Sequence, residues 1–218
     1  MKVLMLAVAV SATVASMPAQ ARQGDVLLRM RAIMVAPNEK SGSVLPGFPG
    51  EKVKVDNSVM PEIDITYMVT DHIGFELIAA TTKHTASGIT GTTGSIGKLA
   101  STWVLPPTLT VQYHPIVEGS VRPYVGAGVN YTLFYSEKAS DALEGAVGST
   151  NVHMSDSFGW ALQAGLDIDI NDRMFVNLDV KYIDMDTTAR LSTTSAGVQR
   201  VRVHLDPIVA GAGIGMRF

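Results

Sequence analysis

The chain has 218 residues, a formal net charge of −3 at pH 7 and no cysteine. Hydrophobic residues make up 46% of it and charged residues 17%, the latter below the roughly 25% that is usual in soluble domains. The missing cysteine excludes disulfides and thiolate chemistry. The weak charge gives no reason to expect a nucleic-acid partner, and the length suits one domain of ordinary size.

The first 21 residues have the pattern of a secretory signal peptide. Lys2 precedes an apolar run at 3–15, and a small-x-small sequence follows at 19–21. This pattern predicts export and cleavage after Ala21, which leaves a single domain over 22–218. The alternative, a membrane anchor, is disfavoured because the run is shorter than the ~20 residues that a spanning helix needs.

Eight later segments alternate apolar and polar residues with the period of two that is typical of a β-strand. They run approximately over 26–34, 62–69, 73–79, 108–114, 125–133, 158–169, 176–182 and from 198 to 218.

The connections between these segments alternate in length. Those at 70–72, 115–120 and 171–173 are tight and carry the Asp, Asn, Gly and Pro that turns favour. The connections at about 37–60, 84–106, 135–156 and 186–197 are long. The Gly-, Thr- and Ser-rich second one is expected to be a mobile loop, and 137–147 could form a short helix. Short turns at one rim and long loops at the other are typical of a bacterial outer-membrane barrel.

A soluble β-sandwich would also alternate, so the content of each face has to decide between the two folds. The polar face combines glycine with both signs of charge, which fits the crowded interior of an eight-stranded barrel. Its charged residues are Arg29, Arg31, Glu62, Asp64, Glu76, Asp167, Asp169, Asp179, Lys181 and Arg217.

Aromatic residues on the apolar face fall at two levels, as in the girdles at the two interfaces of a membrane barrel. Next to the short turns are Tyr67, Phe75, Tyr113 and Phe218, and toward the long loops are Tyr131, Phe158, Trp160 and Tyr182. We therefore predict an all-β protein of the cell outer membrane. It is an eight-stranded antiparallel transmembrane barrel with short periplasmic turns and long extracellular loops.

Five segments together resemble the OmpW family of outer-membrane proteins. They are 107-PTLTVQYHP-115, 122-RPYVGAGVNYTLFY-135, 157-SFGWALQAGLDIDINDR-173, 182-YIDMDTTA-189 and 205-LDPIVAGAGIGMRF-218. The resemblance implies a narrow, largely apolar lumen and uptake of small hydrophobic molecules, with a proposed exit sideways through the wall. The AlkL branch of the family is linked to alkane import, and other members serve as bacteriocin receptors.

The resemblance also identifies departures from the family pattern. Lys181 occupies a lumen position where some relatives carry a large aromatic residue, and Ile208 and Met174 stand where the family often has Trp. Ile78 matches a constriction position of the family.

Six residues are candidates for the transport path. Five of them are apolar residues on the inward phase, and the sixth is the lumen cation: Met68, Ile78, Phe134, Phe175, Ile183 and Lys181. The alternative interpretation is that the apolar residues fill the interior and the lumen charges pair with one another.

No catalytic or metal-binding pattern emerges. The histidines are scattered, and 91-GTTGSIGK-98 departs from a phosphate-binding loop at Thr92 and at Leu99, which follows it. We expect no enzyme activity, no metal and no cofactor.

The sequence therefore predicts a barrel that admits small hydrophobic molecules passively. The alternative is a non-conducting structural or surface-binding barrel, OmpX-like, that serves as a receptor for bacteriocins or phage. The expected partners are the lipid bilayer, lipopolysaccharide, small hydrophobic solutes and the outer-membrane assembly machinery, for which Phe218 would be the terminal aromatic signal. We expect a monomer.

Overall fold

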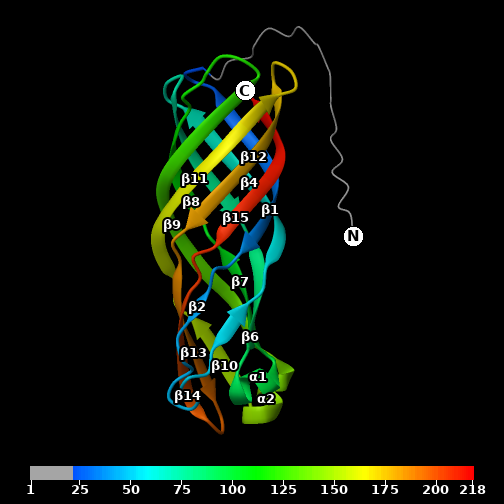
Figure 1. The fold of residues 1–218 in the computed structure, drawn as a ribbon, viewed down its shortest axis with the longest axis vertical. Helices are drawn as coiled ribbons and strands as arrows, with labels where there is room; N and C mark the ends of the chain where they lie inside the picture. Colours follow the sequence, from blue (N-terminus) through cyan, green and yellow to red (C-terminus); the bar gives the residue numbers. More distant parts are fainter. Residues whose placement is uncertain (1–21) are drawn as a thin grey trace, which may run out of the picture.

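The structure is a computed structural model that describes residues 22–218; the predicted signal peptide lies outside the described residues. Eight strands form a closed antiparallel ring (Figure 1). In ring order they are β1 (Val26–Ala36), β4 (Ser58–Met68), β5 (Ile73–Ala80), β8 (Thr108–Tyr113), β9 (Val121–Ala139), β11 (Ser157–Asp169), β12 (Met174–Ile183) and β15 (Ile208–Arg217). The predicted eight-stranded barrel is thus confirmed.

The ring closes where β15 pairs with β1. Val26 and Phe218 exchange two backbone hydrogen bonds of 3.1 and 3.0 Å, and the ladder continues through Arg31 opposite Gly213. A Cβ at Gly213 would lie only 2.0 Å from the carbonyl oxygen of Met30, so the two strands can approach this closely only with glycine there. Closure leaves neither strand with an unpaired edge.

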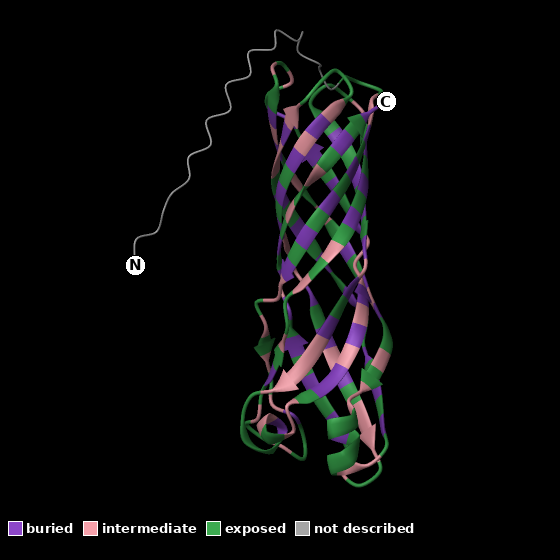
Figure 2. Cartoon of the chain, turned by 90° about the vertical axis from the view of Figure 1, so that its right-hand side faces the viewer, coloured by how far each residue is buried: buried purple, intermediate pink, exposed green. Residues whose placement is uncertain are grey.

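The two faces of the barrel strands have opposite character. Large apolar side chains such as Leu28, Ile65 and Leu178 are 40–46% exposed on the outside, whereas Arg29 and Glu76 are completely buried inside. Figure 2 shows buried and exposed residues alternating along the barrel strands. The outside is thus suited to lipid contact and the inside holds the charges, as the sequence predicts.

Beyond the rim opposite the short turns, the barrel continues as an extension with two walls. The first wall joins the outer half of β9 to β7 (Lys98–Leu105), β6 (Thr82–Gly88) and β3 (Val53–Val55). The second wall consists of β10 (Thr150–Met154), β13 (Asp186–Thr193), β14 (Gly197–His204) and β2 (Lys40–Ser41). Two short helices, α1 (Gly91–Ile96) and α2 (Asp141–Val147), lie at the far end (Figure 1).

The extension corrects the sequence reading of the long connections. The segment 84–106, expected as a mobile loop, contains part of β6, α1 and β7, and the predicted eighth strand is broken at 205–207 into β14 and β15. The reason is pairing between distant segments, such as β2 with β14, which adds strands too short to recognise singly. The short helix is confirmed over Asp141–Val147, where the Ser140 hydroxyl accepts the Leu143 N–H at 3.1 Å.

No helix in the described part of the chain is long and apolar enough to cross a membrane.

Candidate functional site

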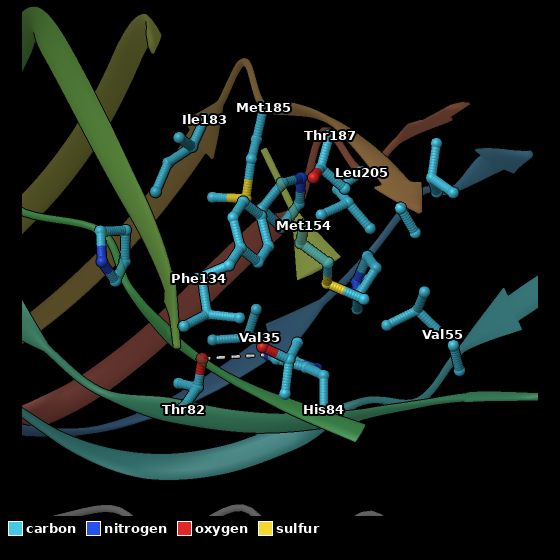
Figure 3. Close-up of a pocket in the computed structure, with 18 of the residues that line it drawn as sticks. Val35, Val55, Thr82, His84, Phe134, Met154, Ile183, Met185, Thr187 and Leu205 are labelled. Atoms are coloured by element: carbon cyan, nitrogen blue, oxygen red, sulfur yellow. Dashed lines mark hydrogen bonds between the residues drawn. The ribbon is translucent and has the colours of Figure 1, made fainter. Parts of the chain in front are cut away.

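An apolar chamber lies between the two walls and extends from there into the adjoining end of the barrel. Its volume is about 110 Å³. The lining comes from inward positions of both walls and of the barrel strands below them, including Val35, Ala80, Ala100, Val104, Phe134, Met154, Ile183, Met185, Ala189, Val201 and Leu205. Figure 3 shows Phe134 of β9, Met154 of β10 and Met185 of the connection between β12 and β13 projecting into it. The inward residues of the two walls are mostly apolar and together form one continuous hydrophobic surface.

The few polar groups in the chamber wall are hydrogen-bonded to one another or to the backbone. The His84 ring is 2.9 Å from the Asp56 carbonyl through Nδ1 and 3.1 Å from the Thr82 hydroxyl through Nε2 (Figure 3). These groups consequently offer little to a polar ligand, and the chamber suits an apolar one.

Lys181 and Glu62 mark the floor of the chamber, where the lining changes from apolar to charged. The Lys181 ammonium lies 2.9 Å from the Glu62 carboxylate and 2.5 Å from that of Asp179. Arg31 reaches Glu62 at 2.8 Å from the other side. All of these side chains are 97% or more buried, so the predicted lumen cation takes part in a closed ion network.

A second cation extends this network toward the short-turn rim. Arg29 lies 3.1 Å from Asp64, 3.5 Å from Glu76 and 2.9 Å from Asp167. Asp64 and Glu76 also pair with Arg31, so both layers are linked. We call the eight side chains the polar plug: Arg29, Arg31, Lys181, Glu62, Asp64, Glu76, Asp167 and Asp179.

The polar plug separates the chamber from the other rim. Removing one partner from a buried ion pair costs about 3–5 kcal/mol, and an apolar solute moving straight down would have to part several such pairs. The barrel wall itself supplies these side chains. The chamber is therefore closed below by fixed charges.

Met68 and Phe175 lie beyond the polar plug. Together with Leu27 they form a small, fully buried apolar cluster. The Arg29 and Arg122 guanidinium carbons stand 5.5 and 5.6 Å from the centre of the Phe175 ring. These two predicted path residues point inward but do not line the chamber, because they lie at the opposite end of the lumen.

The ladder between β9 and β11 stops at the base of the extension. Its last pair is Thr132 with Ser157. Beyond this pair, carboxylate side chains accept hydrogen bonds from backbone N–H groups of the two segments. Asp156 accepts the Phe134 N–H at 3.4 Å, and Glu137 accepts the Met154 N–H at 3.3 Å. The two walls thus meet here through carboxylates rather than a continuous sheet.

A groove opens on the outside at this break. It is lined by Leu105, Leu133, Phe134, Tyr135, His153, Met154 and Asp156. Phe134 and Met154 belong to both the groove and the chamber. These two flexible or rotatable apolar side chains therefore stand between the interior and the outer surface.

The remaining predicted residues divide between the chamber and the outer surface. Ile78, Phe134, Lys181 and Ile183 line the chamber. Of the predicted girdle residues, seven are exposed on the outside and Tyr182 is half-buried: Tyr67, Phe75, Tyr113, Tyr131, Phe158, Trp160, Tyr182 and Phe218. The Trp160 and Tyr182 rings lie 5.2 Å apart between centroids.

Most of the chamber lining was not identified from the sequence, because it lies in the segments read as loops. Val201 and Val203 alternate with Arg200 and Arg202, and this short period-two pattern is the signal that could have identified them. Within 22–218, no group of three or more His, Asp or Glu side chains is arranged to hold a metal ion.

Taken together, the lipid-facing barrel, the interior ion network and the walled chamber define a membrane β-barrel of the outer-membrane type. The model of the OmpW family matches residues 22–218, and the chain belongs to that family. Its relatives are outer-membrane proteins, and this protein likewise belongs to the cell outer membrane.

Two sequence relatives illustrate the similarity. Outer membrane protein W of Vibrio cholerae is 35% identical over 221 residues, which cover 100% of both chains. The dibenzothiophene metabolism operon protein PahQ of Pseudomonas aeruginosa is 30% identical over 184 residues, covering 82% of this chain and 79% of PahQ.

Solved structures agree with the fold. The outer membrane protein OprG of Pseudomonas aeruginosa superposes with a TM-score of 0.85 at 32% identity, covering 91% of this chain and 98% of OprG. The structure of AlkL in lipid bilayers gives a TM-score of 0.66 at 22% identity, covering 98% and 97% of the two chains, and supports the fold alone.

Proposed function

We propose that this barrel mediates passive uptake of small hydrophobic molecules, which enter the chamber from outside and leave sideways into the membrane. The observation that carries the proposal is an apolar chamber closed below by the polar plug. An apolar solute gains from leaving water for the chamber, and it meets buried charge if it moves straight on. Neither step requires catalysis or an energy source.

The size of the chamber favours small, compact solutes. Its volume of about 110 Å³ is somewhat less than the ~150 Å³ of an engineered cavity that binds benzene. Apolar contacts discriminate only weakly between similar molecules, so we expect loose specificity among small aromatic and short aliphatic compounds. The name of PahQ, which refers to dibenzothiophene metabolism, agrees with an aromatic solute.

The lateral exit is supported by the break between β9 and β10. Phe134 and Met154 alone are shared by the chamber and the outer groove among the residues that line them. A rotamer change of either side chain would join the two spaces without breaking the barrel ladder, which ends at Thr132 and Ser157.

Uptake of toluene or a short alkane by a strain lacking this protein, with and without the gene restored, tests the proposal. We expect faster uptake with the protein, slower uptake for Ala100→Trp, which fills the chamber, and faster uptake for Phe134→Ala, which widens the passage to the groove. Ala100→Leu is the milder variant.

Ser101→Trp is the matched control. Ser101 follows Ala100 on β7, but its side chain is half-buried and does not line the chamber. This variant should leave uptake unchanged. Equal uptake with and without the protein would refute transport, and equal slowing by Ala100→Trp and Ser101→Trp would remove the chamber from the route. Heat-modifiable migration on gels confirms that each variant is folded.

A second function, a non-conducting barrel that binds at the surface, is favoured by the polar plug. The plug blocks a straight pore. The uptake assay separates the two proposals, because a surface-binding barrel would leave the uptake of apolar solutes unchanged.

We also propose the setting in which the barrel works. The signal peptide over 1–21 is removed, the assembly machinery recognises Phe218, and the folded barrel stays monomeric in a leaflet that contains lipopolysaccharide. Closure of the ring within one chain supports the monomer, because the eight barrel strands leave no edge for a second copy.

A further inference from the structure

The outer face of the second wall carries a concentration of positive charge. Its outward residues on β13, β14 and β2 include Arg190, Arg200, Arg202 and Lys40, and we call these four the basic face. All four side chains are exposed, while their neighbours Ala189, Val201 and Val203 point into the chamber. The basic face is therefore on the opposite side of the wall from the proposed transport path.

These cations are placed against one another in the sheet. Arg190 lies directly opposite Arg200 across β13 and β14, and Arg202 is the next outward residue on β14. Like charges directly opposite each other destabilise a sheet. Within the described chain, no carboxylate is within ion-pair distance of any of the three arginines. Folding alone thus does not account for the arrangement.

The acidic groups near the basic face lie at the end of the wall that adjoins the barrel. Among the described residues of β10, β13, β14 and β2, Asp186 is the one that carries a carboxylate. Its carboxylate oxygen lies 2.5 Å from Nδ1 of His204. Nearer the barrel, burial and the carboxylates of Asp206 and Asp186 raise the pKa of Asp184. The charge therefore changes from acidic near the membrane to basic farther out.

The basic face stands above the lipid headgroups. Asp186 is four residues and Arg190 eight residues beyond Tyr182 of the outer girdle. With a rise of ~3.3 Å per residue and a strand tilt of ~40°, these positions are roughly 10 and 20 Å farther out. The headgroup region occupies only about 5–8 Å on each side of a bilayer.

In an outer leaflet that contains lipopolysaccharide, the sugar core is the layer that lies at this height. β13 and β14 run along the side of the extension (Figure 1), so their outer face looks across the membrane surface rather than away from the cell. Core sugars near lipid A carry phosphate and carboxylate groups, and arginine binds both with paired hydrogen bonds.

We propose that the basic face is a docking site for the anionic inner core of lipopolysaccharide. Arg190, Arg200 and Arg202 contact its phosphates or carboxylates, and Lys40 adds charge at the end of the wall that adjoins the barrel. The proposal does not depend on whether the chamber conducts solutes.

The test is a titration of the folded full-length barrel in detergent with two fluorescently labelled probes. One probe is lipopolysaccharide with a phosphorylated inner core, and the other is lipid A without core sugars. EDTA in the buffer removes divalent cations that could link the core to Asp184, Asp186 and Asp206. Fluorescence anisotropy gives the two affinities.

The triple variant Arg190→Gln, Arg200→Gln, Arg202→Gln should bind the core-bearing probe at least tenfold more weakly than the wild type does, and lipid A within twofold of it. The three corresponding Arg→Lys substitutions should retain most of the binding, since the charge remains. The matched control is Lys54→Gln, Lys83→Gln, Lys98→Gln, which removes three exposed cations from the first wall and should bind like the wild type.

Two results would overturn the proposal: unchanged affinity in the arginine variant, or an equal loss in the lysine control. A third titration uses heparin. Arginine-dependent binding of heparin without binding of the core-bearing probe would also overturn the proposal and assign the face to a soluble polyanion. The single variant Arg200→Gln should show a smaller loss, which keeps the test decisive if the triple variant does not fold.

Discussion

Replacing Lys181 by methionine tests the polar plug where it meets the chamber. Lys181→Met keeps an unbranched side chain one heavy atom shorter and removes its charge. The ammonium lies 2.9 Å from Glu62 and 2.5 Å from Asp179, and loss of one partner from a buried pair costs about 3–5 kcal/mol. Arg31 remains 2.8 Å from Glu62 and 3.7 Å from Asp179. We therefore expect a loss near the lower limit, about 3 kcal/mol of the free energy of unfolding.

Guanidinium unfolding in detergent, followed by tryptophan fluorescence and gel migration, measures this loss. The double variant Lys181→Met, Glu62→Gln should regain part of it, because it no longer buries an excess carboxylate. The same cycle with Glu62→Gln alone gives the coupling between the two side chains. A stability for Lys181→Met within 1 kcal/mol of the wild type would contradict the fixed, fully paired floor described above.

Three further predictions concern other parts of the barrel. Gly213→Ala should reduce stability by about 1–3 kcal/mol, the usual cost of overpacking, because its Cβ meets the Met30 carbonyl. Gly145→Ala should not reduce stability, because a Cβ there meets nothing within 4 Å. Equal unfolding midpoints for the two variants would refute this prediction. Phe218→Ala should lower the yield of assembled barrel in cells far more than Ile116→Ala, an exposed apolar control in a short turn; equal yields would remove Phe218 from the assembly signal. Lys181→Trp should change single-channel conductance in planar bilayers, and unchanged conductance would show that Lys181 does not lie at a constriction.

The membrane part of the fold could be predicted because its pattern is local and repeated. In β11, Trp160, Leu162 and Ala164 alternate with inward Ala161 and Gln163, and lipid on one side with a crowded lumen on the other enforces that period. The same period gave Lys181 and Glu62 their inward positions. It did not reveal which charges pair, since Arg31 reaches Glu62, Asp64, Glu76 and Asp179 from three other strands.

The extension was harder to predict because its strands are short and their partners are distant. Lys40 pairs with His204, and Val53 with Gly88. Strand preference depends on such neighbours more than on the residue itself. Chamber residues such as Val104 and Val203 were therefore missed, although they alternate like the barrel strands. Met68 and Phe175 do not line the chamber for a different reason. An alternating pattern shows which side of a strand faces inward, but not which inward residues lie at the level of the chamber.

The two-residue period of the second wall separates two kinds of evolutionary change. Ala189 lines the chamber and its neighbour Arg190 faces the surroundings, so a substitution at one leaves the surface presented by the other intact. Selection on the outward residues consequently acts on a different set of codons from selection on the residues that shape the interior. The outer surface of this protein can diversify while its cavity keeps the same chemical character.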